Sequence, residues 1–227
     1  MSLIIKFIGH SAFVINYGAN SIIIDPFITG NSQAKFDPVD LNVRDILITH
    51  AHGDHLGDSI EIAKKKSATI TAMFEIANYC AKKGVKTQGV NMGGKVPFSW
   101  GNAYWLPAAH SSSMPDGQYG GEAAGILLNI GGTSVFHAGD TGLHLNFKMI
   151  GEFYKPEISI LPIGGYYTMG IDEAVQAAKW LGSKKIIPMH YNTFPQIQID
   201  VKEFKKRIES EASAECIILN PGEIYKI

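Results

Sequence analysis

Cysteine and excess charge, which mark several protein classes, are both scarce in this chain. Its 227 residues include only two cysteines, Cys80 and Cys216, which have no CxxC spacing and stand among apolar residues. We interpret both as buried free thiols in a reducing compartment. Twenty Lys and Arg against 21 Asp and Glu give a formal net charge of −1. No basic surplus therefore indicates a nucleic-acid partner or an anionic membrane surface.

Long apolar runs are missing as well. The longest, such as Ile22–Ile24, span a few residues, far short of the ~18 that a membrane span needs. We therefore expect no stable membrane insertion. The first residues show no basic region followed by an apolar stretch and a small-residue cleavage site, which favours a cytoplasmic location. With 18% charged and 45% apolar residues, the composition is typical of a compact globular protein.

Glycine, in contrast, is abundant and indicates many tight turns, since 24 residues are about one and a half times the usual ~7%. No Pro/Ser-rich linker or charge run divides the chain, so we predict one domain over residues 1–227. Periodicity and turn residues predict strands at Leu3–Ile8, Ala12–Asn16, Ser21–Ile24, Arg44–Thr49, Val96–Phe98, Ala103–Leu106, Gly125–Ile130, Thr133–His137, Lys185–Pro188 and Cys216–Leu219. The same signals predict helices at Asp58–Lys66, Met73–Lys83, Asp172–Leu181 and Asp200–Ser210.

An internal similarity links the two halves of the chain. Residues Ala12–Asp25 can be aligned with Gly125–Ala138, and Asn, Gly and Ser recur at the same offsets. Each of these hairpins leads to an acidic residue, and each half ends in helices. The pattern suggests two βα halves packed face to face, with sheets inside and helices outside.

The segment Thr49-His50-Ala51-His52-Gly53-Asp54-His55 carries the strongest chemical signal. With this composition, H-x-H-x-D-H arises by chance in roughly four of ten thousand sequences. Three imidazoles and a carboxylate within six residues, directly after a predicted strand, indicate metal ligands. Neutral imidazole nitrogen and carboxylate oxygen suit Zn²⁺ first, with Fe and Mn as alternatives.

Further ligands must come from elsewhere, because one loop cannot complete two metal coordination shells. His110 precedes Ser111-Ser112-Ser113 at the end of a predicted strand, and Asp140 lies in a Gly-flanked turn after another. His190 again follows a buried strand. Such strand-end turns are where α/β proteins place their sites.

Six short motifs extend this pattern over essentially the whole chain. They are Gly9-His10-Ser11, Asp25-Pro26-Phe27, His137-Ala-Gly-Asp-Thr-Gly142, Pro162-Ile-Gly-Gly165, Thr168-Met-Gly170 and Pro188-Met-His-Tyr-Asn-Thr-Phe-Pro195. Together with H-x-H-x-D-H they resemble the metallo-β-lactamase superfamily of binuclear metal hydrolases. Within it, they are similar to a branch of poorly characterised metal-dependent hydrolases related to ascorbate-6-phosphate lactonase and N-acylphosphatidylethanolamine phospholipase D.

The resemblance implies an α+β fold, a four-layer αββα sandwich with the site at one edge of the two sheets. It implies a first metal ion held by His50, His52 and His110, a second held by Asp54, His55 and His190, and Asp140 bridging them. Asp25 would accept a hydrogen bond from a ligand imidazole and fix its tautomer. A plain turn carboxylate before Pro26 is the alternative.

Two divalent ions, Zn first and Mn or Fe as alternatives, would bridge a water and lower its pKa from 15.7 towards ~7. The resulting metal-bridged hydroxide would attack a small soluble ester, lactone, amide or phosphodiester. Asp54 is the first catalytic candidate, as the residue that orients the nucleophile or moves its proton. His10 is the second, in contact with substrate or metal-bound oxygen; an ordinary hydrogen-bonded turn histidine is the alternative.

Residues in or next to the last three of the six motifs are candidates for the substrate pocket, namely Tyr166, Tyr167, Met169 and Asn192. His144 departs from the branch pattern, and a surface or packing role is favoured over a role at the site.

Two other functions stay open on the same scaffold. One is an iron-dependent oxidoreductase; diiron redox members typically carry Glu where this chain has His52, which favours the hydrolase. The other is a lipid phosphodiesterase, although no basic amphipathic helix is present. We expect a small-molecule substrate and no nucleic-acid partner. The sequence is compatible with a homo-oligomer.

Overall fold

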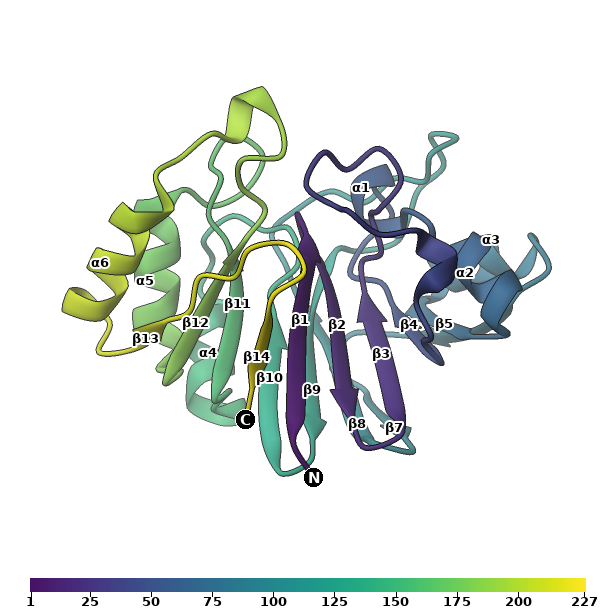
Figure 1. Ribbon diagram of the computed structural model, residues 1–227, viewed down its shortest axis with the longest axis horizontal. Helices are drawn as coiled ribbons and strands as arrows, with labels where there is room; N and C mark the ends of the chain where they lie inside the picture. Colours follow the sequence, from purple (N-terminus) through teal and green to yellow (C-terminus); the bar gives the residue numbers. More distant parts are fainter.

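The computed structural model describes residues 1–227 and contains two seven-stranded sheets (Figure 1). In spatial order the first sheet comprises β14 (Ile224–Lys226), β1 (Leu3–Gly9), β2 (Ala12–Tyr17), β3 (Asn20–Ile24), β4 (Asp45–Leu47), β5 (Thr69–Met73) and β6 (Lys86–Val90). The second comprises β13 (Glu215–Cys216), β12 (Lys185–Met189), β11 (Ile158–Pro162), β10 (Thr133–His137), β9 (Ala124–Ile130), β8 (Gly101–Pro107) and β7 (Lys95–Phe98).

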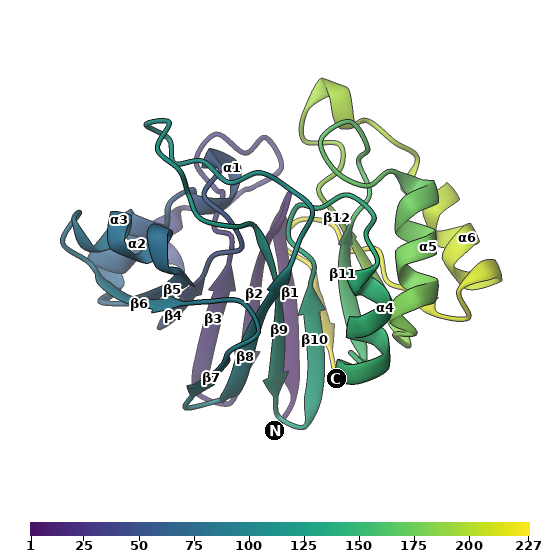
Figure 2. The same cartoon turned by 180° about the vertical axis from the view of Figure 1, so that it is seen from behind.

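Helices cover the outer faces of both sheets. The α-helices are α1 (Gly53–Leu56), α2 (Ser59–Lys66), α3 (Phe74–Ala81), α4 (Asn146–Met149), α5 (Ile171–Leu181) and α6 (Val201–Glu211). Shorter turns are η1 (Pro38–Asp40), η2 (Ile150–Tyr154) and η3 (Pro195–Ile197). Helices α2 and α3 pack on β5 and β6, whereas α5 and α6 pack on β11 and β13 at the opposite end of the molecule (Figure 2). No helix combines the length and apolar character needed to cross a bilayer.

The two sheets face each other across a shared core. Buried side chains of the first sheet, such as Ile5 and Phe13, belong to the same apolar cluster as Trp105 and Ile126 of the second. On α5 the apolar side chains of Ala174, Val175, Ala178 and Leu181 are buried, and the helix ends at Gly182 in the left-handed region. The expected αββα sandwich is therefore confirmed.

Both sheets have the same internal plan, in which one half is antiparallel and the other half is parallel. The antiparallel halves are β14-β1-β2-β3 and β7-β8-β9-β10. In the β2–β3 hairpin Asn16 pairs with Ser21, and in the β9–β10 hairpin Asn129 pairs with Ser134. The Asn and Ser residues that recur in the sequence thus occupy equivalent cross-strand positions in the two halves.

Several elements differ from the sequence prediction. Strands β5, β6, β11 and β14 were not predicted. For two of them the reason is local: β5 runs directly into α3 without a Gly or Pro break, and β6 is largely exposed. The strand expected at Cys216–Leu219 is limited to Glu215–Cys216, since β13 is an edge strand that pairs with β12 over only two residues.

Candidate metal centre

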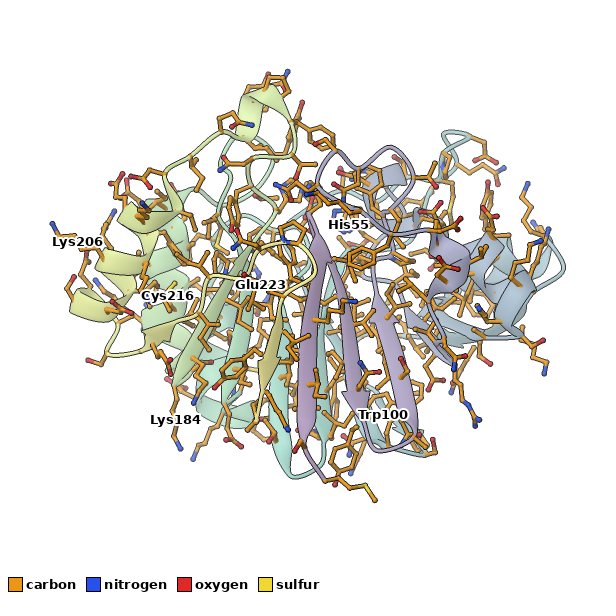
Figure 3. The ribbon with its side chains drawn as sticks, in the orientation of Figure 1. His55, Trp100, Lys184, Lys206, Cys216 and Glu223 are labelled. Atoms are coloured by element: carbon orange, nitrogen blue, oxygen red, sulfur yellow. The ribbon has the colours of Figure 1, made fainter.

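The predicted ligands meet at one edge of the sandwich, where four strands end. His50 follows β4, His110 follows β8, Asp140 follows β10 and His190 follows β12. These strands run in the same direction, so their carboxyl ends lie at the edge where His55 is labelled (Figure 3). Residues far apart in the sequence are thereby brought to one place.

The short helix α1 carries the rest of the predicted ligands. His52 is its N-cap, and Asp54 and His55 lie within its single turn. The helix ends at Gly57, where φ is +41° and an added Cβ would collide with the carbonyl of Pro26. Glycine at this position lets α1 approach the loop that carries Asp25.

Three overlapping groups of side chains could hold a metal ion, and in each the ligand atoms lie within 4.8 Å of one another. The groups are His50, His52 and His110; His10, Asp54, His55 and His190; and His50, His55 and Asp140. The carboxylate of Asp140 lies between them, because its Oδ1 is 3.2 Å from His55 Nε2 and its Oδ2 is 3.0 Å from His190 Nε2 and 3.7 Å from His110 Nε2.

Several of these atoms have the spacing of ligands but no hydrogen-bond partner. Asp140 Oδ1 and the Nε2 atoms of His55 and His190 are buried and have no hydrogen-bond partner. Orphaned buried polar atoms are rare in proteins and call for an explanation. Tetrahedral bonds of ~2.05 Å separate neighbouring ligand nitrogens by about 3.3 Å, and His50 Nε2 lies 3.0 Å from His52 Nδ1. The residues present therefore fit a bound transition-metal ion.

The buried Asp25 orients two of these histidines. His55 Nδ1–H donates to Asp25 Oδ2 over 2.8 Å, and the Thr49 hydroxyl donates to the same oxygen over 2.6 Å. Because that hydroxyl has given its hydrogen to Asp25, its oxygen accepts from His50 Nδ1–H at 3.0 Å. When neutral, both rings thus present an unprotonated Nε2 to the centre. The sequence pointed to Asp25, but it contained no signal for Thr49 beyond its place before the motif.

Burial and neighbouring charges act on the titration of the cluster. Burial lowers the pKa of His50 well below its usual value, which keeps that ring neutral and able to bind metal. Burial also opposes charge on His55, yet the carboxylates of Asp140 and Asp25 outweigh it and raise the pKa of His55. The site thus favours a positive charge between these two carboxylates, which a metal cation would supply.

His10 lies in the turn after β1 and is fully buried. Its Nε2 is 3.2 Å from Asp54 Oδ2, and its Nδ1 is 3.0 Å from the Thr193 hydroxyl. Its ring packs against that of His190, with 4.0 Å between centroids. Burial lowers the pKa of His10 to about 4, although the hydrogen bond with Asp54 acts in the opposite direction.

His137 joins the two sheets beneath the site. Its Nε2–H donates to the Ser11 carbonyl over 2.9 Å, and its Nδ1 accepts from the amide of Gly139 over 3.2 Å. These bonds fix the turn that carries His10 and the turn that carries Asp140. Sequence reasoning did not include His137 in the site, although it belongs to the same motif as Asp140.

A cavity of about 510 Å³ opens onto the cluster. Its lining residues are His52, Asp54, His110, Ser111, Asp140, Tyr167, His190, Phe194, Pro195 and Gln196. Of the four predicted pocket residues, only Tyr167 is among them. Phe194 to Gln196 were missed, although Phe194 and Pro195 end the last motif.

The other three pocket predictions need correction. Met169 is 1% exposed in the core of the second half, and Asn192 uses its side chain to hold the backbone of Ile199. Tyr166 is 78% exposed and does not line the cavity. His144 stacks on Phe147 with 4.4 Å between centroids, in accordance with a packing role.

Comparisons with known proteins agree with this geometry. A family model described as a beta-lactamase superfamily domain matches residues 4–190. A UPF0173 metal-dependent hydrolase of Thermus thermophilus is 43% identical over 223 residues, covering 98% of each chain. Another from Pyrococcus abyssi is 46% identical over 226 residues, covering 96% of this chain and 97% of that protein. The structure of Igni18, a metallo hydrolase from Ignicoccus hospitalis, superposes with a TM-score of 0.92 at 37% identity, covering 100% of this chain and 99% of the other.

The chain therefore belongs to the beta-lactamase superfamily. Within that superfamily, the chain belongs to the UPF0173 family of metal-dependent hydrolases.

Proposed function

We propose that this protein is a binuclear metal-dependent hydrolase, with zinc as the first candidate metal and a small soluble ester, lactone, amide or phosphodiester as substrate. One observation carries the proposal. The Asp140 carboxylate lies between two groups of ligand atoms, and its own Oδ1 and the facing imidazole nitrogens have no hydrogen-bond partner. A second cation beside the first would account for both groups.

The residues divide into those that would hold the ions and those that would act on the substrate. His50, His52 and His110 would hold one ion; Asp54, His55 and His190 would hold the other, and Asp140 would bridge them. Bound divalent ions would acidify water and polarise the substrate oxygen. Asp54 is 27% exposed and lines the cavity, so its free oxygen can orient a nucleophilic water or accept its proton.

The cavity supports a small substrate. Its volume lies within the ~300–1,000 Å³ typical of small-molecule sites. Phe194, Pro195 and Tyr167 supply an apolar wall, whereas no Lys or Arg lines the cavity. Phosphoryl-transfer sites commonly add such cations to the metal ions. Esters, lactones and amides with an apolar group are therefore the first substrates to test, and phosphodiesters and lipids follow.

The decisive experiment is metal analysis followed by turnover. The protein is purified without added metal, and Zn, Fe, Mn and Ni per chain are measured by plasma mass spectrometry. We expect about two Zn or Mn ions per chain, together with hydrolysis of at least one ester, lactone or thioester. Predominant iron with oxygen consumption would favour the oxidoreductase. No bound metal, even after reconstitution, would refute the ligand assignment.

Asp54→Asn tests the catalytic assignment separately. We expect loss of most turnover in the metal-replete variant, because the amide cannot accept a proton. Full activity with both ions bound would rule out this role for Asp54.

A further inference from the structure

The Asp54 carboxylate depends on a single side chain for its orientation. Its Oδ2 is 3.2 Å from His10 Nε2, and this is the only hydrogen bond that the carboxylate makes with the protein. On its other side Asp54 faces the cavity. Without His10, the Asp54 carboxylate would have no hydrogen bond to the protein, and its nearest basic neighbour would be His190, whose Nε2 is 3.9 Å from Oδ2.

The environment of His10 determines which of its nitrogens carries hydrogen. A carboxylate oxygen can only accept, so the contact with Asp54 requires a hydrogen on Nε2 of the neutral ring and of the charged one alike. In the neutral ring Nδ1 is then an acceptor. The Thr193 hydroxyl, 3.0 Å away, can donate to it in preference to the Tyr191 carbonyl, which lies farther from this hydroxyl at 3.3 Å. An imidazole nitrogen that carries hydrogen has no lone pair for a metal ion. Hence His10, unlike the neighbouring histidines, does not bind a metal ion through Nε2, although its ring lies close to their ligand atoms.

The backbone of His10 is held as firmly as its ring. Its amide donates to Gln33 Oε1 over 3.1 Å, and its carbonyl accepts from the amide of His190 over 2.9 Å. Both His10 and His190 adopt left-handed backbone angles, with φ of +58° and +55°. Such conformations in residues with a side chain persist where the surroundings enforce them, and they cluster at functional sites.

We propose that His10 is a positioning residue that holds the Asp54 carboxylate through Nε2–H, outside the metal shell, and that Thr193 supports the ring tautomer this requires by donating to Nδ1. The effect on catalysis rests on the proposed role of Asp54. With Oδ2 occupied by His10, Oδ1 is the atom left to face metal and substrate. His10, in the turn after β1, and Thr193, in the loop after β12, thereby orient Asp54 of α1.

Three variants separate this role from metal binding. His10→Ala removes the donor, His10→Gln keeps an N–H near Nε2, and Thr193→Val removes the hydroxyl while preserving the side-chain shape. We expect kcat to fall about 10–100-fold in His10→Ala and by less in the other two, because hydrogen bonds to charged groups are worth about this factor. In assays with zinc in excess, KM and the number of metal ions per chain should stay at wild-type values.

Ser32→Ala is the matched control. The Ser32 hydroxyl donates to the Thr193 carbonyl over 3.3 Å, so this variant disturbs the same loop without touching His10. Its kcat should equal that of the wild type on whichever of p-nitrophenyl acetate and bis(p-nitrophenyl) phosphate the enzyme cleaves faster. A fall as large as that in Thr193→Val would mean that loop damage, and not the tautomer, lowers the rate, which would overturn the role of Thr193.

The tautomer itself can be measured independently of turnover. In ¹⁵N-labelled, zinc-loaded wild-type protein, imidazole nitrogen–proton correlation spectra should show His10 with hydrogen on Nε2. An Nε2 without hydrogen, or loss of a metal ion in His10→Ala and His10→Gln, would make His10 a ligand and overturn the proposal. If the wild type hydrolyses none of the substrates, the proposed function fails, whereas the spectrum still decides the state of His10.

Discussion

Replacing Asp25 by Asn should weaken metal binding while leaving the fold in place. Asp25 accepts three hydrogen bonds in the core of the site, from the Thr49 amide, the Thr49 hydroxyl and His55 Nδ1–H. Asparagine has nearly the same shape and tolerates the left-handed backbone angle found here, where φ is +48°. It has only one accepting oxygen, however, so its NH₂ group must face at least one donor in either orientation.

The size of the effect follows from the bonds that are lost. A hydrogen bond to a charged group contributes about 1.5–3 kcal/mol. If roughly 1.4–2.8 kcal/mol of this acts on the orientation of His55 and His50, metal affinity falls about 10–100-fold, which is the usual range for such outer partners. The ion held by His55 should be affected first, since that imidazole bonds Asp25 directly.

Competition with a chromophoric chelator measures this affinity, and circular dichroism checks the fold. Asp58→Asn is the control, because the Asp58 carboxylate accepts the amides of Ile28 and Thr29 in the neighbouring loop but contacts no proposed ligand. We expect Asp58→Asn to lose stability and keep wild-type affinity. Wild-type affinity in a folded Asp25→Asn variant would refute the claim that Asp25 orients the ligand histidines.

Three further predictions concern the centre and the core. Full removal of metal by a chelator should lower Tm by about 5–10 °C, because ions at 100 times their Kd contribute ~2.7 kcal/mol; scanning calorimetry with an unchanged Tm would argue against a structural role for the ions. Gly164→Ala should reduce metal content, since its Cβ would collide with the carbonyl of His190; plasma mass spectrometry tests this, with Gly94→Ala, where the nearest contact is an ordinary one, as control. Burial raises the pKa of Cys80 to about 11 and that of Cys216 to about 12, so at pH 8 neither thiol should react with a disulfide reagent until the protein is unfolded.

Local sequence was informative where the chemistry is local. The spacing of His50, His52, Asp54 and His55 is dictated by a strand end and one helical turn, and it could be interpreted from six residues. Hairpins with clear alternation, such as β2–β3 and β9–β10, were predicted for the same reason. Their side chains alternate between two faces, and that alternation is visible in the residue order.

Loop conformation was beyond reach of the same reasoning. Tyr166, Tyr167 and Met169 are neighbours in one glycine-rich loop, yet one points to solvent, one lines the cavity and one is buried in the core. The difference comes from left-handed backbone angles at Gly165 and Tyr166, which turn the chain in a way that no periodicity records. Phe194 was also missed as a lining residue; it follows left-handed backbone angles at His190 and Asn192.

The sequence alone predicted the αββα architecture, through strand and helix patterns and a family resemblance. It also predicted the set of residues capable of binding metal. Only the tertiary structure decided which atoms meet. Asp25 and His55 are 30 positions apart, and His10 and Thr193 are 183 apart, yet each pair is within hydrogen-bond distance. The first contact joins the segments that follow two neighbouring parallel strands, β3 and β4, whereas the second joins loops of the two sheets that pack face to face. Residue order specifies the strands, whereas side-chain packing between the sheets determines the distances on which the chemistry depends.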